Sequence, residues 1–407
     1  MLSVFVNFWN DRLLRIAFLC ILMMGAALAS IVPFQSVIGI EQLGFTSTQY
    51  AILMIIGSII GVTASISAGI YCDQTGYYKQ VLITCIITGI VAGCLMYFLP
   101  SKFSFIMFHT LLAPLAFTAF TQYFALASLS AARNKHINKD FSMSLIRASF
   151  AGSYALTPPF WALLIANDVE LITVYGFIAL VHVIILVLVF TNWPSKNQSE
   201  PEQKSGMSFL QALKELTSKS ILMRLFLISL MTGTNALYNI ILGLLILNNL
   251  GGSESDVGFF AGGVALMEVP IMLGSAIILR HMSRTQLMFV GMVIYAGFLI
   301  GISSFQTLQY AWFLIIPAGI GAGILLSVPL SYIQELKSNR PGASSALISV
   351  SQVMAMVIAS LIFALGSYFT DYAGIAWIGA TLGLIASALL LVLDRYANDR
   401  YTRTRRG

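Results

Sequence analysis

The stretch that decides the fold is residues 171–206, which read LITVYGFIALVHVIILVLVF at 171–190 and TNWPSKNQSEPEQKSG at 191–206. The first part holds no Asp, Glu, Lys or Arg, and roughly 20 such residues in a helix span a bilayer core about 30 Å thick. The second part is polar and contains two prolines, which is typical of a flexible linker. The sequence therefore predicts a membrane span followed by a connection between two parts of the chain.

The whole chain has the composition of a membrane protein. Hydrophobic residues make up 58% of its 407 residues and charged residues only 9%, whereas soluble domains carry about a quarter charged residues. The mean hydropathy is +0.87, and the apolar runs are continuous rather than alternating, which favours helices over a membrane barrel. The four cysteines all fall at or within apolar runs, as expected of small buried side chains rather than bridges or metal ligands. Soluble globular, disordered and disulfide-rich classes are therefore excluded.

Apolar runs between polar breaks predict an all-α polytopic membrane protein with 12 transmembrane helices in two six-helix halves. The predicted spans are 16–40, 47–70, 80–99, 103–130, 141–166 and 171–191, then 221–249, 256–279, 286–305, 308–334, 342–366 and 374–393. Ala27-Leu28-Ala29 resembles a signal-peptidase site, but cleavage there would leave eleven spans and unequal halves. We therefore expect an uncleaved first helix.

The polar linker divides these spans into two sets of six. The expected domains are an N-terminal six-helix bundle at 1–191, a cytosolic linker with a short interfacial helix at 192–220, a C-terminal six-helix bundle at 221–393 and a cytosolic basic tail at 394–407. The interfacial helix is predicted because Phe209, Leu213 and Leu216 share one helix face. Two such halves are the architecture of carriers that rock around a midplane site. A receptor or scaffold with twelve spans is the alternative.

The basic residues predict the orientation. With the N-terminus in the cytosol, only Lys102 lies outside and only Arg147 lies within a helix, so 20 of the 22 Lys and Arg residues are cytosolic. This bias accounts for the net charge of +6, so no nucleic-acid partner is expected, and the Arg-rich tail suits contact with anionic lipid. We expect a multi-pass, monomeric protein of the cell inner (plasma) membrane with both termini in the cytosol.

One loop resembles a signature of the major facilitator superfamily. Residues 69–79 read GIYCDQTGYYK and resemble G-x-L-A-D-R-x-G-R-K, of which Gly69, Asp73 and Gly76 are kept. The resemblance implies that Asp73 pairs with a base across the two halves and closes a cytosolic gate. The arginine positions are replaced, which weakens the charge relay that the signature implies. An ordinary turn beside a cytosolic lysine is the alternative.

Further stretches are similar to the sugar efflux transporter family. They are Gln122–Ala127, Arg147-Ala148 with Pro158-Pro159, Glu268-Val269-Pro270, Gln334-Glu335-Leu336 through Arg340 to Gly342-Ala343, and Asn235 with Tyr238. This resemblance covers the whole chain and implies proton-linked export of sugars or sugar-like compounds. One departure is that Ile240 and Ile241 stand late in the seventh span, where an acidic residue is expected. The substrate and part of the coupling scheme therefore stay open.

The fifth predicted span carries part of an antiporter signature, G-x-x-x-G-P. Gly152 is followed by Thr157-Pro158-Pro159, so the proline pair is kept and one glycine is lost. Prolines inside a span free backbone carbonyls, which a cavity or a neighbouring helix must satisfy. A packing kink is the alternative. The residues assigned to gating and conformational change are Gly69, Asp73, Gly76, Gly152, Pro158, Pro159, Gln334, Glu335 and Arg340.

Two charged residues, Arg147 and Glu268, lie well inside the predicted spans. Each costs at least about 2.5 kcal/mol at a helix centre unless it is paired or wetted. A carboxyl group removed from water holds its proton more readily, so Glu268 is the predicted proton acceptor. A nearby Arg147 would favour the ionised carboxylate and so promote release of the proton. A structural ion pair is the alternative. His109 and His182 are expected to be hydrogen-bonded structural residues rather than proton relays.

Spans one, four, seven and ten usually line the cavity in this architecture. Their amide and aromatic residues, with one amide from span eleven, form the predicted substrate-binding set: Gln35, Gln122, Tyr123, Asn235, Tyr238, Asn239 and Gln352. Amides both donate and accept hydrogen bonds, which suits hydroxyl-rich ligands, and aromatic faces stack on sugar rings. A single intramembrane arginine argues against a phosphorylated cargo, so a neutral sugar or glycoside is expected. For each residue taken alone, helix packing is the alternative.

Enzyme motifs are absent from the sequence. It holds no Walker loop, no G-x-G-x-x-G after a strand, no H-E-x-x-H and no Cys/His cluster, so no enzyme, cofactor or metal is expected. The sequence predicts a secondary transporter that exports neutral sugars by proton antiport with alternating access. A proton-coupled multidrug exporter of the same fold is the alternative.

Overall fold

The computed structural model describes residues 2–133, 137–193, 219–336 and 341–404, and these contain helices and turns but no strand. The predicted interfacial helix, most of the linker, and Arg340 lie outside the described residues. In chain order the helices are α1 (Leu2–Asn10), α2 (Arg12–Ile31), η1 (Val37–Gln42), α3 (Ser47–Thr75), α4 (Tyr78–Phe98), α5 (Lys102–Met107), η2 (Phe108–Leu112), α6 (Ala113–Arg133), α7 (Lys139–Ile165) and α8 (Thr173–Asn192), followed by α10 (Lys219–Asn248), α11 (Glu254–Ile278), α12 (Arg284–Ser304), α13 (Leu308–Ala311), η4 (Trp312–Leu314), α14 (Ile315–Leu336), α15 (Pro341–Gly366) and α16 (Tyr372–Thr404).

Eleven helical segments of the described chain are long and apolar enough to cross a membrane. The long helix that falls short is α7, which has 27 residues but carries Arg147, several hydroxyls and two prolines. Its low hydropathy thus reflects polar content rather than length, and with it the number of long helical segments is twelve. The predicted all-α polytopic membrane fold is confirmed.

The chain divides into two compact units. Unit 1 comprises Met1–Phe45 and Ile56–Gly206, and unit 2 comprises Thr46–Ile55 and Met207–Gly407. The first turns of α3 therefore belong to unit 2, where the rings of Tyr50 and Phe363 meet edge to face at 6.1 Å. The remainder of α3 belongs to unit 1.

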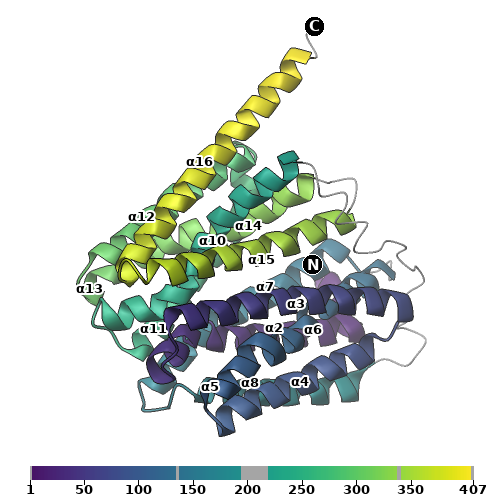
Figure 1. Cartoon of the computed structure of the whole chain (residues 1–407). Helices are drawn as coiled ribbons and strands as arrows, with labels where there is room; N and C mark the ends of the chain where they lie inside the picture. Colours follow the sequence, from purple (N-terminus) through teal and green to yellow (C-terminus); the bar gives the residue numbers. More distant parts are fainter. Residues whose placement is uncertain (1, 134–136, 194–218, 337–340, 405–407) are drawn as a thin grey trace. The chain divides into compact units, whose positions relative to one another are not determined.

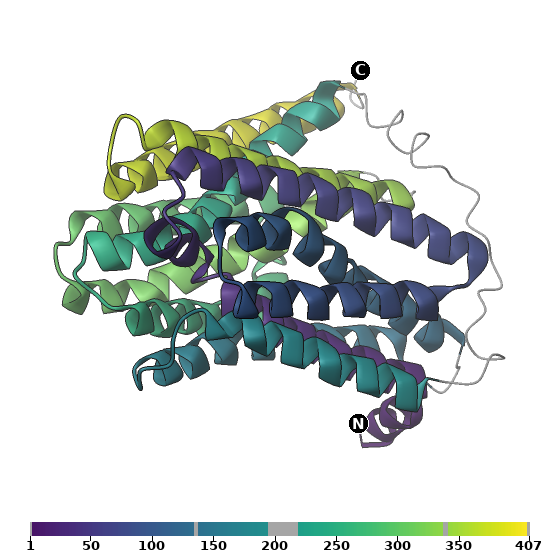
Figure 2. The ribbon, with the colours of Figure 1, turned by 60° about the horizontal axis from the view of Figure 1, so that its bottom comes forward.

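In unit 1, α2 packs against α6, α7 and α8, while α4 packs against α6 and α8. Figure 2 shows α4 and α8 side by side. Gly93 of α4 makes this approach possible, since a Cβ there would lie 2.6 Å from the backbone nitrogen of Ala179 and from the carbonyl oxygen of Tyr175. Small residues at such contacts let helix backbones approach closely in lipid.

In unit 2, α10 packs against α15 and α16, α12 against α14 and α16, and α11 against α14 (Figure 1). Gly319 and Gly323, four residues apart on α14, form the α11–α14 contact: a Cβ on Gly323 would lie 2.9 Å from the carbonyl oxygen of Glu268. The glycines therefore fix how closely α14 approaches the segment that carries Glu268.

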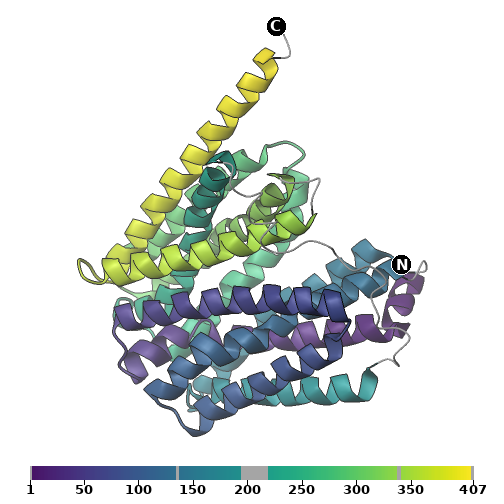
Figure 3. The same cartoon turned by 45° about the vertical axis from the view of Figure 1, so that its right-hand side comes forward.

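Two predicted spans differ from the observed helices. The first, at 16–40, is interrupted, because α2 ends at Ile31 and a π-helical segment follows at Val37–Gln42. At the other end of the chain, α16 has 33 residues and continues through Thr404, beyond the predicted end of the span at 393. Figures 1 and 3 show α16 running past the ends of the helices it packs against.

Candidate functional site

Several predicted site residues of unit 2 gather around Tyr295 of α12. The Tyr295 hydroxyl donates a hydrogen bond of 2.8 Å to Oδ1 of Asn235. Its ring lies edge to face with the ring of Tyr238, at a centroid distance of 6.3 Å, and Glu268 is close enough to act on Tyr295 electrostatically. We call these four residues the Tyr295 cluster.

Three helices bring the Tyr295 cluster together. Asn235 and Tyr238 stand three residues apart on α10 and therefore share one face of that helix. Phe298, one turn beyond Tyr295 on α12, meets the ring of Tyr238 at 5.4 Å and an interplanar angle of 74°. These edge-to-face contacts fix the positions of the rings. Tyr295 is 0% exposed and Tyr238 only 4%, so Asn235 and Glu268, which are partly exposed, are the members of the cluster that a ligand can reach.

Glu268 is the ionisable member of the cluster. Its helix, α11, begins with a capping box between Ser253 and Asp256 and contains Pro270 two residues after the carboxylate. Proline cannot donate a backbone hydrogen bond, which frees the carbonyl group one turn earlier, at Leu266. Among the described residues of unit 2, no side chain or backbone group bonds or pairs with the Glu268 carboxyl group. The carboxyl is therefore available to a proton or a ligand.

Arg147, the second predicted intramembrane charge, lies on α7 in unit 1 and is exposed there. It forms no ion pair with any described residue of that unit. A charged side chain inside a span ordinarily faces a bundle interior or a water-filled cavity. Each unit thus carries one intramembrane charge that its own described residues leave unpaired.

The predicted residues of unit 1, Gln122 and Tyr123, lie deep in the packing, with exposures of 2% and 0%. Gln122 donates from Nε2 to the hydroxyl of Thr121 at 3.2 Å, while its Oε1 finds no partner in the described part of the chain. The Tyr123 hydroxyl lies against the thiol of Cys20 on α2. The Tyr123 hydroxyl, like the Gln122 carbonyl, makes no hydrogen bond to any described residue. Buried polar atoms without a partner are uncommon, so both groups are informative.

The remaining predicted binding residues do not join the Tyr295 cluster. Gln35 follows the turn at 32–34 and directly precedes η1, Asn239 is half-buried on α10 and Gln352 is exposed on α15. Within the described part of unit 2, neither Asn239 nor Gln352 makes a hydrogen bond to the cluster. Their assignment to a binding site stays a prediction.

The motif loop of unit 1 makes a local contact around Asp73. Its carboxylate accepts a hydrogen bond of 2.7 Å from the hydroxyl of Tyr78, which stands where the signature has a basic residue. Gly76 has a φ of 75°, and its backbone N–H donates to the carbonyl of Cys72. Glycine adopts this left-handed conformation without steric penalty, which ends α3 at the turn. Gly69 packs near the amide of Gln122.

The predicted gate residue Glu335 pairs with Arg284 of α12, at 2.7 Å between Oε1 and Nη2. A second and more buried group, which no motif marks, joins α14 to α10 and α16. Arg224 of α10 lies 3.0 Å from the Asp394 carboxylate of α16, and the Tyr332 hydroxyl of α14 donates to the same carboxylate. These residues are up to 170 positions apart in sequence. Their position near the ends of predicted spans is the one sequence feature that indicated a role. Gln334 is exposed beside Glu335.

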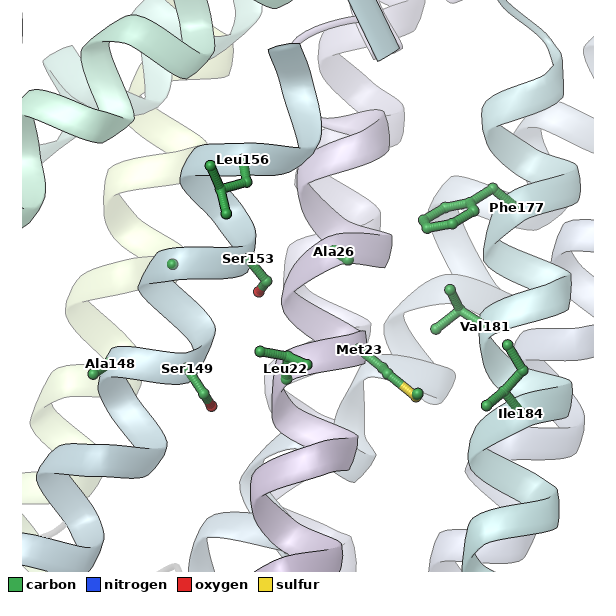
Figure 4. Close-up of a pocket in the computed structure, with 11 residues that line it drawn as sticks. Leu22, Met23, Ala26, Ala148, Ser149, Ser153, Leu156, Phe177, Val181 and Ile184 are labelled. Carbon is green, nitrogen blue, oxygen red and sulfur yellow. The ribbon is translucent and has the colours of Figure 1, made fainter. Parts of the chain in front are cut away.

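The proline pair does not break α7, which is helical from Lys139 to Ile165. Instead α7, α2 and α8 line an apolar groove of about 590 Å³, into which Gly152 opens. Figure 4 shows Leu22 and Ala26 on the middle helix, Ser149 and Ser153 on one flank, and Val181 on the other. Both serine hydroxyls donate to carbonyls of their own helix, at 2.8 and 2.9 Å. The groove therefore suits aliphatic material rather than a sugar.

Both intramembrane histidines are hydrogen-bonded inside unit 1, in agreement with the structural role expected of them. Nε2 of His109 lies 3.0 Å from the hydroxyl of Tyr175, and Nδ1 of His182 lies 2.7 Å from the carbonyl oxygen of Ile178. His109 stands in the π-helical segment η2. The His109 contact ties η2 to α8, whereas the His182 contact stays within α8.

The family follows from a match across most of the chain, in which residues 17–360 fit the Major Facilitator Superfamily. The chain belongs to this superfamily. It is therefore a membrane transporter and not an enzyme. As a major facilitator protein it is 24% identical over 368 residues to sugar efflux transporter A of Escherichia coli (strain K12), covering 89% of this chain and 92% of that protein. It is 26% identical over 321 residues to sugar efflux transporter B of Salmonella typhimurium (strain LT2), covering 79% and 80%. The resemblance to sugar efflux transporters is thus confirmed.

Solved structures share the fold of this major facilitator protein at low identity. The nucleoside transporter NupG superposes with a TM-score of 0.77 at 12% identity, covering 95% of this chain and 98% of that one. A POT family transporter in complex with a thioalcohol-conjugated peptide gives a TM-score of 0.74 at 11% identity, covering 94% and 96%. These cargoes differ in chemistry, so the superpositions support the fold alone.

Proposed function

We propose that this protein exports sugars or sugar-like neutral compounds by proton antiport with alternating access. The observation that carries the proposal is the Tyr295 cluster. In it, the carboxyl group of Glu268, unpaired within the described part of its unit, acts electrostatically on Tyr295, which in turn contacts an amide and a second tyrosine. The relatives named sugar efflux transporters support the class of cargo.

Glu268 is the proposed proton carrier. A carboxyl group in a span is stable when neutral and costly when charged unless water or a cation is near. Alternating exposure to the two sides of the membrane would then load and release one proton for each cycle of the carrier. Arg147, exposed on α7 and unpaired within the described part of unit 1, would supply the positive charge that favours release.

Of the predicted binding residues, the proposed cargo contacts are those that are at least partly exposed, namely Asn235, Asn239, Gln352 and Gln35. The buried Gln122, Tyr123 and Tyr238 are proposed to support such contacts from within the packing of their own units. Amide groups offer two donors and an acceptor each, which matches the hydroxyls of a neutral sugar. Arg147 is the single basic residue at depth, and a phosphorylated cargo would require several. A neutral sugar or glycoside therefore fits this inventory best.

The proposed gate consists of the motif loop, Gly69 to Gly76 with Asp73, the α7 residues Gly152, Pro158 and Pro159, and the Gln334–Glu335–Arg340 segment. The protein would lie in the cell inner membrane with both termini on the cytosolic side, and its basic C-terminal end would contact anionic lipid. One chain contains both halves of the carrier, so a monomer suffices.

The test is transport of labelled neutral sugars in proteoliposomes with an imposed pH gradient. We expect gradient-driven movement in the wild type and its loss in Glu268→Gln, because glutamine cannot carry the proton. Sugar-for-sugar exchange without a gradient should persist in the same variant, which separates lost coupling from misfolding. Equal gradient dependence in both proteins would exclude Glu268 as the carrier. Movement of a lipophilic dye, with no sugar moved, would replace sugar export by multidrug export.

A further inference from the structure

The hydrogen bond inside the Tyr295 cluster is directional, because the Tyr295 hydroxyl donates and Oδ1 of Asn235 accepts. An asparagine amide has one acceptor oxygen and a nitrogen with two donors. In this arrangement the oxygen is engaged by the Tyr295 hydroxyl, and a half-turn of the amide would replace this bond by an N–H donation to the phenol oxygen. The nitrogen is therefore the end of Asn235 that remains for a ligand.

Exposure assigns different roles to the two residues. Tyr295 is 0% exposed, so it cannot touch a cargo molecule, whereas Asn235 is partly exposed. The ring of Tyr295 is held separately, by Tyr238, by Phe298 and by Gly321 of α14, where a Cβ would lie 2.7 Å from the Tyr295 Cβ. The hydroxyl can thus be removed without removing the packing of the ring.

We propose that Tyr295 is a positioning residue that turns the Asn235 amide so that its N–H groups point to the cargo. The site would then recognise an acceptor oxygen, such as a sugar hydroxyl or ring oxygen, at the point nearest α10. This inference rests on the proposed function for the identity of the cargo, but the orientation of the amide follows from the geometry of the cluster.

Four variants test the inference by transport kinetics in proteoliposomes: Tyr295→Phe, Asn235→Ala, Asn235→Asp and the double variant Tyr295→Phe/Asn235→Ala. Tyr295→Phe should raise KM about 5- to 10-fold with little change in the maximal rate, as expected for the loss of one oriented hydrogen bond. Asn235→Asp keeps an oxygen for Tyr295 but lacks the N–H groups, so its KM should rise as much as that of Asn235→Ala.

The double variant separates positioning from general packing. If Tyr295 acts only through Asn235, removing its hydroxyl in the Asn235→Ala background adds nothing to KM. Multiplied effects, or a Tyr295→Phe variant with an unchanged KM, would overturn the proposal. Tyr175→Phe is the matched control, since it removes a buried hydroxyl bonded to His109 in unit 1 and should leave KM unchanged.

An infrared measurement tests the bond without any cargo. With isotope-labelled tyrosine, the difference spectrum of wild type against Tyr295→Phe isolates the phenol C–O stretch of Tyr295. We expect a hydrogen-bond donor band that shifts in Asn235→Ala, and an unshifted band would overturn the proposal. If the wild type moves no sugar but this band shifts, the proposed function fails while the contact between Tyr295 and Asn235 stands. The KM values of the four variants are then measured with the lipophilic dye that the protein transports.

Discussion

The two units tie their helix ends together by different chemistry. In unit 2, Arg224 pairs with Asp394 at 3.0 Å and Arg284 pairs with Glu335 at 2.7 Å. The corresponding contacts in the described part of unit 1 join a carboxylate to an uncharged hydroxyl rather than to a basic group: Asp11 accepts a hydrogen bond of 2.9 Å from the hydroxyl of Ser130, and Asp73 accepts one from Tyr78. Removing a partner in unit 2 strands a charge, whereas removing a hydroxyl in unit 1 does not, so the units should differ in their sensitivity to mutation.

The largest difference is expected for Arg224→Ala against Ser130→Ala. The Arg224 and Asp394 side chains are only 13% and 21% exposed, so the stranded Asp394 should lower the stability of unit 2 by about 2–3 kcal/mol. Asp11 keeps the backbone N–H of Leu14 at 3.0 Å and is partly exposed, so solvent can replace the lost hydroxyl and Ser130→Ala should cost only about 1 kcal/mol. Thermal unfolding in detergent, followed by tryptophan fluorescence, gives the two shifts in Tm.

The double variant Arg224→Ala/Asp394→Ala is the control for this comparison. It removes both charges and should recover part of the Tm lost in Arg224→Ala. Equal Tm shifts in Arg224→Ala and Ser130→Ala would contradict the difference between the units.

The second comparison concerns one glycine in each unit. A Cβ at Gly323 would meet the carbonyl oxygen of Glu268 and the Cβ of Ile271 at 2.9 Å, whereas nothing lies within 4 Å of a Cβ at Gly152. Gly323→Ala should therefore destabilise unit 2 by about 1–3 kcal/mol through overpacking. Gly152→Ala should be neutral or stabilising by up to about 1 kcal/mol, because alanine favours the helix. A loss of Tm in Gly152→Ala comparable to that in Gly323→Ala would show that the groove in unit 1 is filled.

Most of the fold could be predicted from the sequence, because spans and close helix contacts depend on local patterns. Apolar runs mark the helices, and the four-residue spacing of Gly319 and Gly323 marks the α11–α14 contact. The interruption after Ile31 could not be predicted in this way. Residues 32–40 include Pro33, Gln35 and Ser36 but stay apolar on average, so a hydropathy window keeps them in one span with α2. Pro33 is the local signal that could have marked the end of the helix.

The candidate site was predictable only in part, because its contacts join distant residues. Glu268, Asn235 and Tyr238 could be named, since a charge or an amide inside a span is conspicuous. Tyr295 could not, because a tyrosine in an apolar helix has the pattern of ordinary packing until its hydrogen bond to Asn235, 60 residues away, is known. The same reason hides the group of Arg224, Tyr332 and Asp394, which lie on three different helices.

A third comparison uses the same substitution in both units, Tyr332→Phe and Tyr175→Phe. The Tyr332 hydroxyl donates to the charged Asp394 at 2.9 Å, and hydrogen bonds to charged groups are the stronger ones, so its loss should cost about 1.5–2 kcal/mol. The Tyr175 hydroxyl bonds a histidine at 3.0 Å, and its loss should cost about 1 kcal/mol. Both figures are measured as Tm shifts in the same detergent, and the opposite order would contradict the stronger role of charge in unit 2.

The smallest effect is expected for Arg284→Gln, which tests whether charge alone or buried charge distinguishes unit 2. The Arg284 and Glu335 side chains are 34% and 56% exposed, and pairs as open as this contribute about 0–1 kcal/mol. Salt screens such a pair, so the Tm difference from wild type should vanish near 1 M salt, where the screening length is about 3 Å. The deficit of Arg224→Ala should persist at the same salt concentration, because its carboxylate partner is largely shielded from solvent. If the Tm differences of Arg284→Gln and Arg224→Ala from wild type both vanished at high salt, burial of the charges would not explain the greater sensitivity of unit 2.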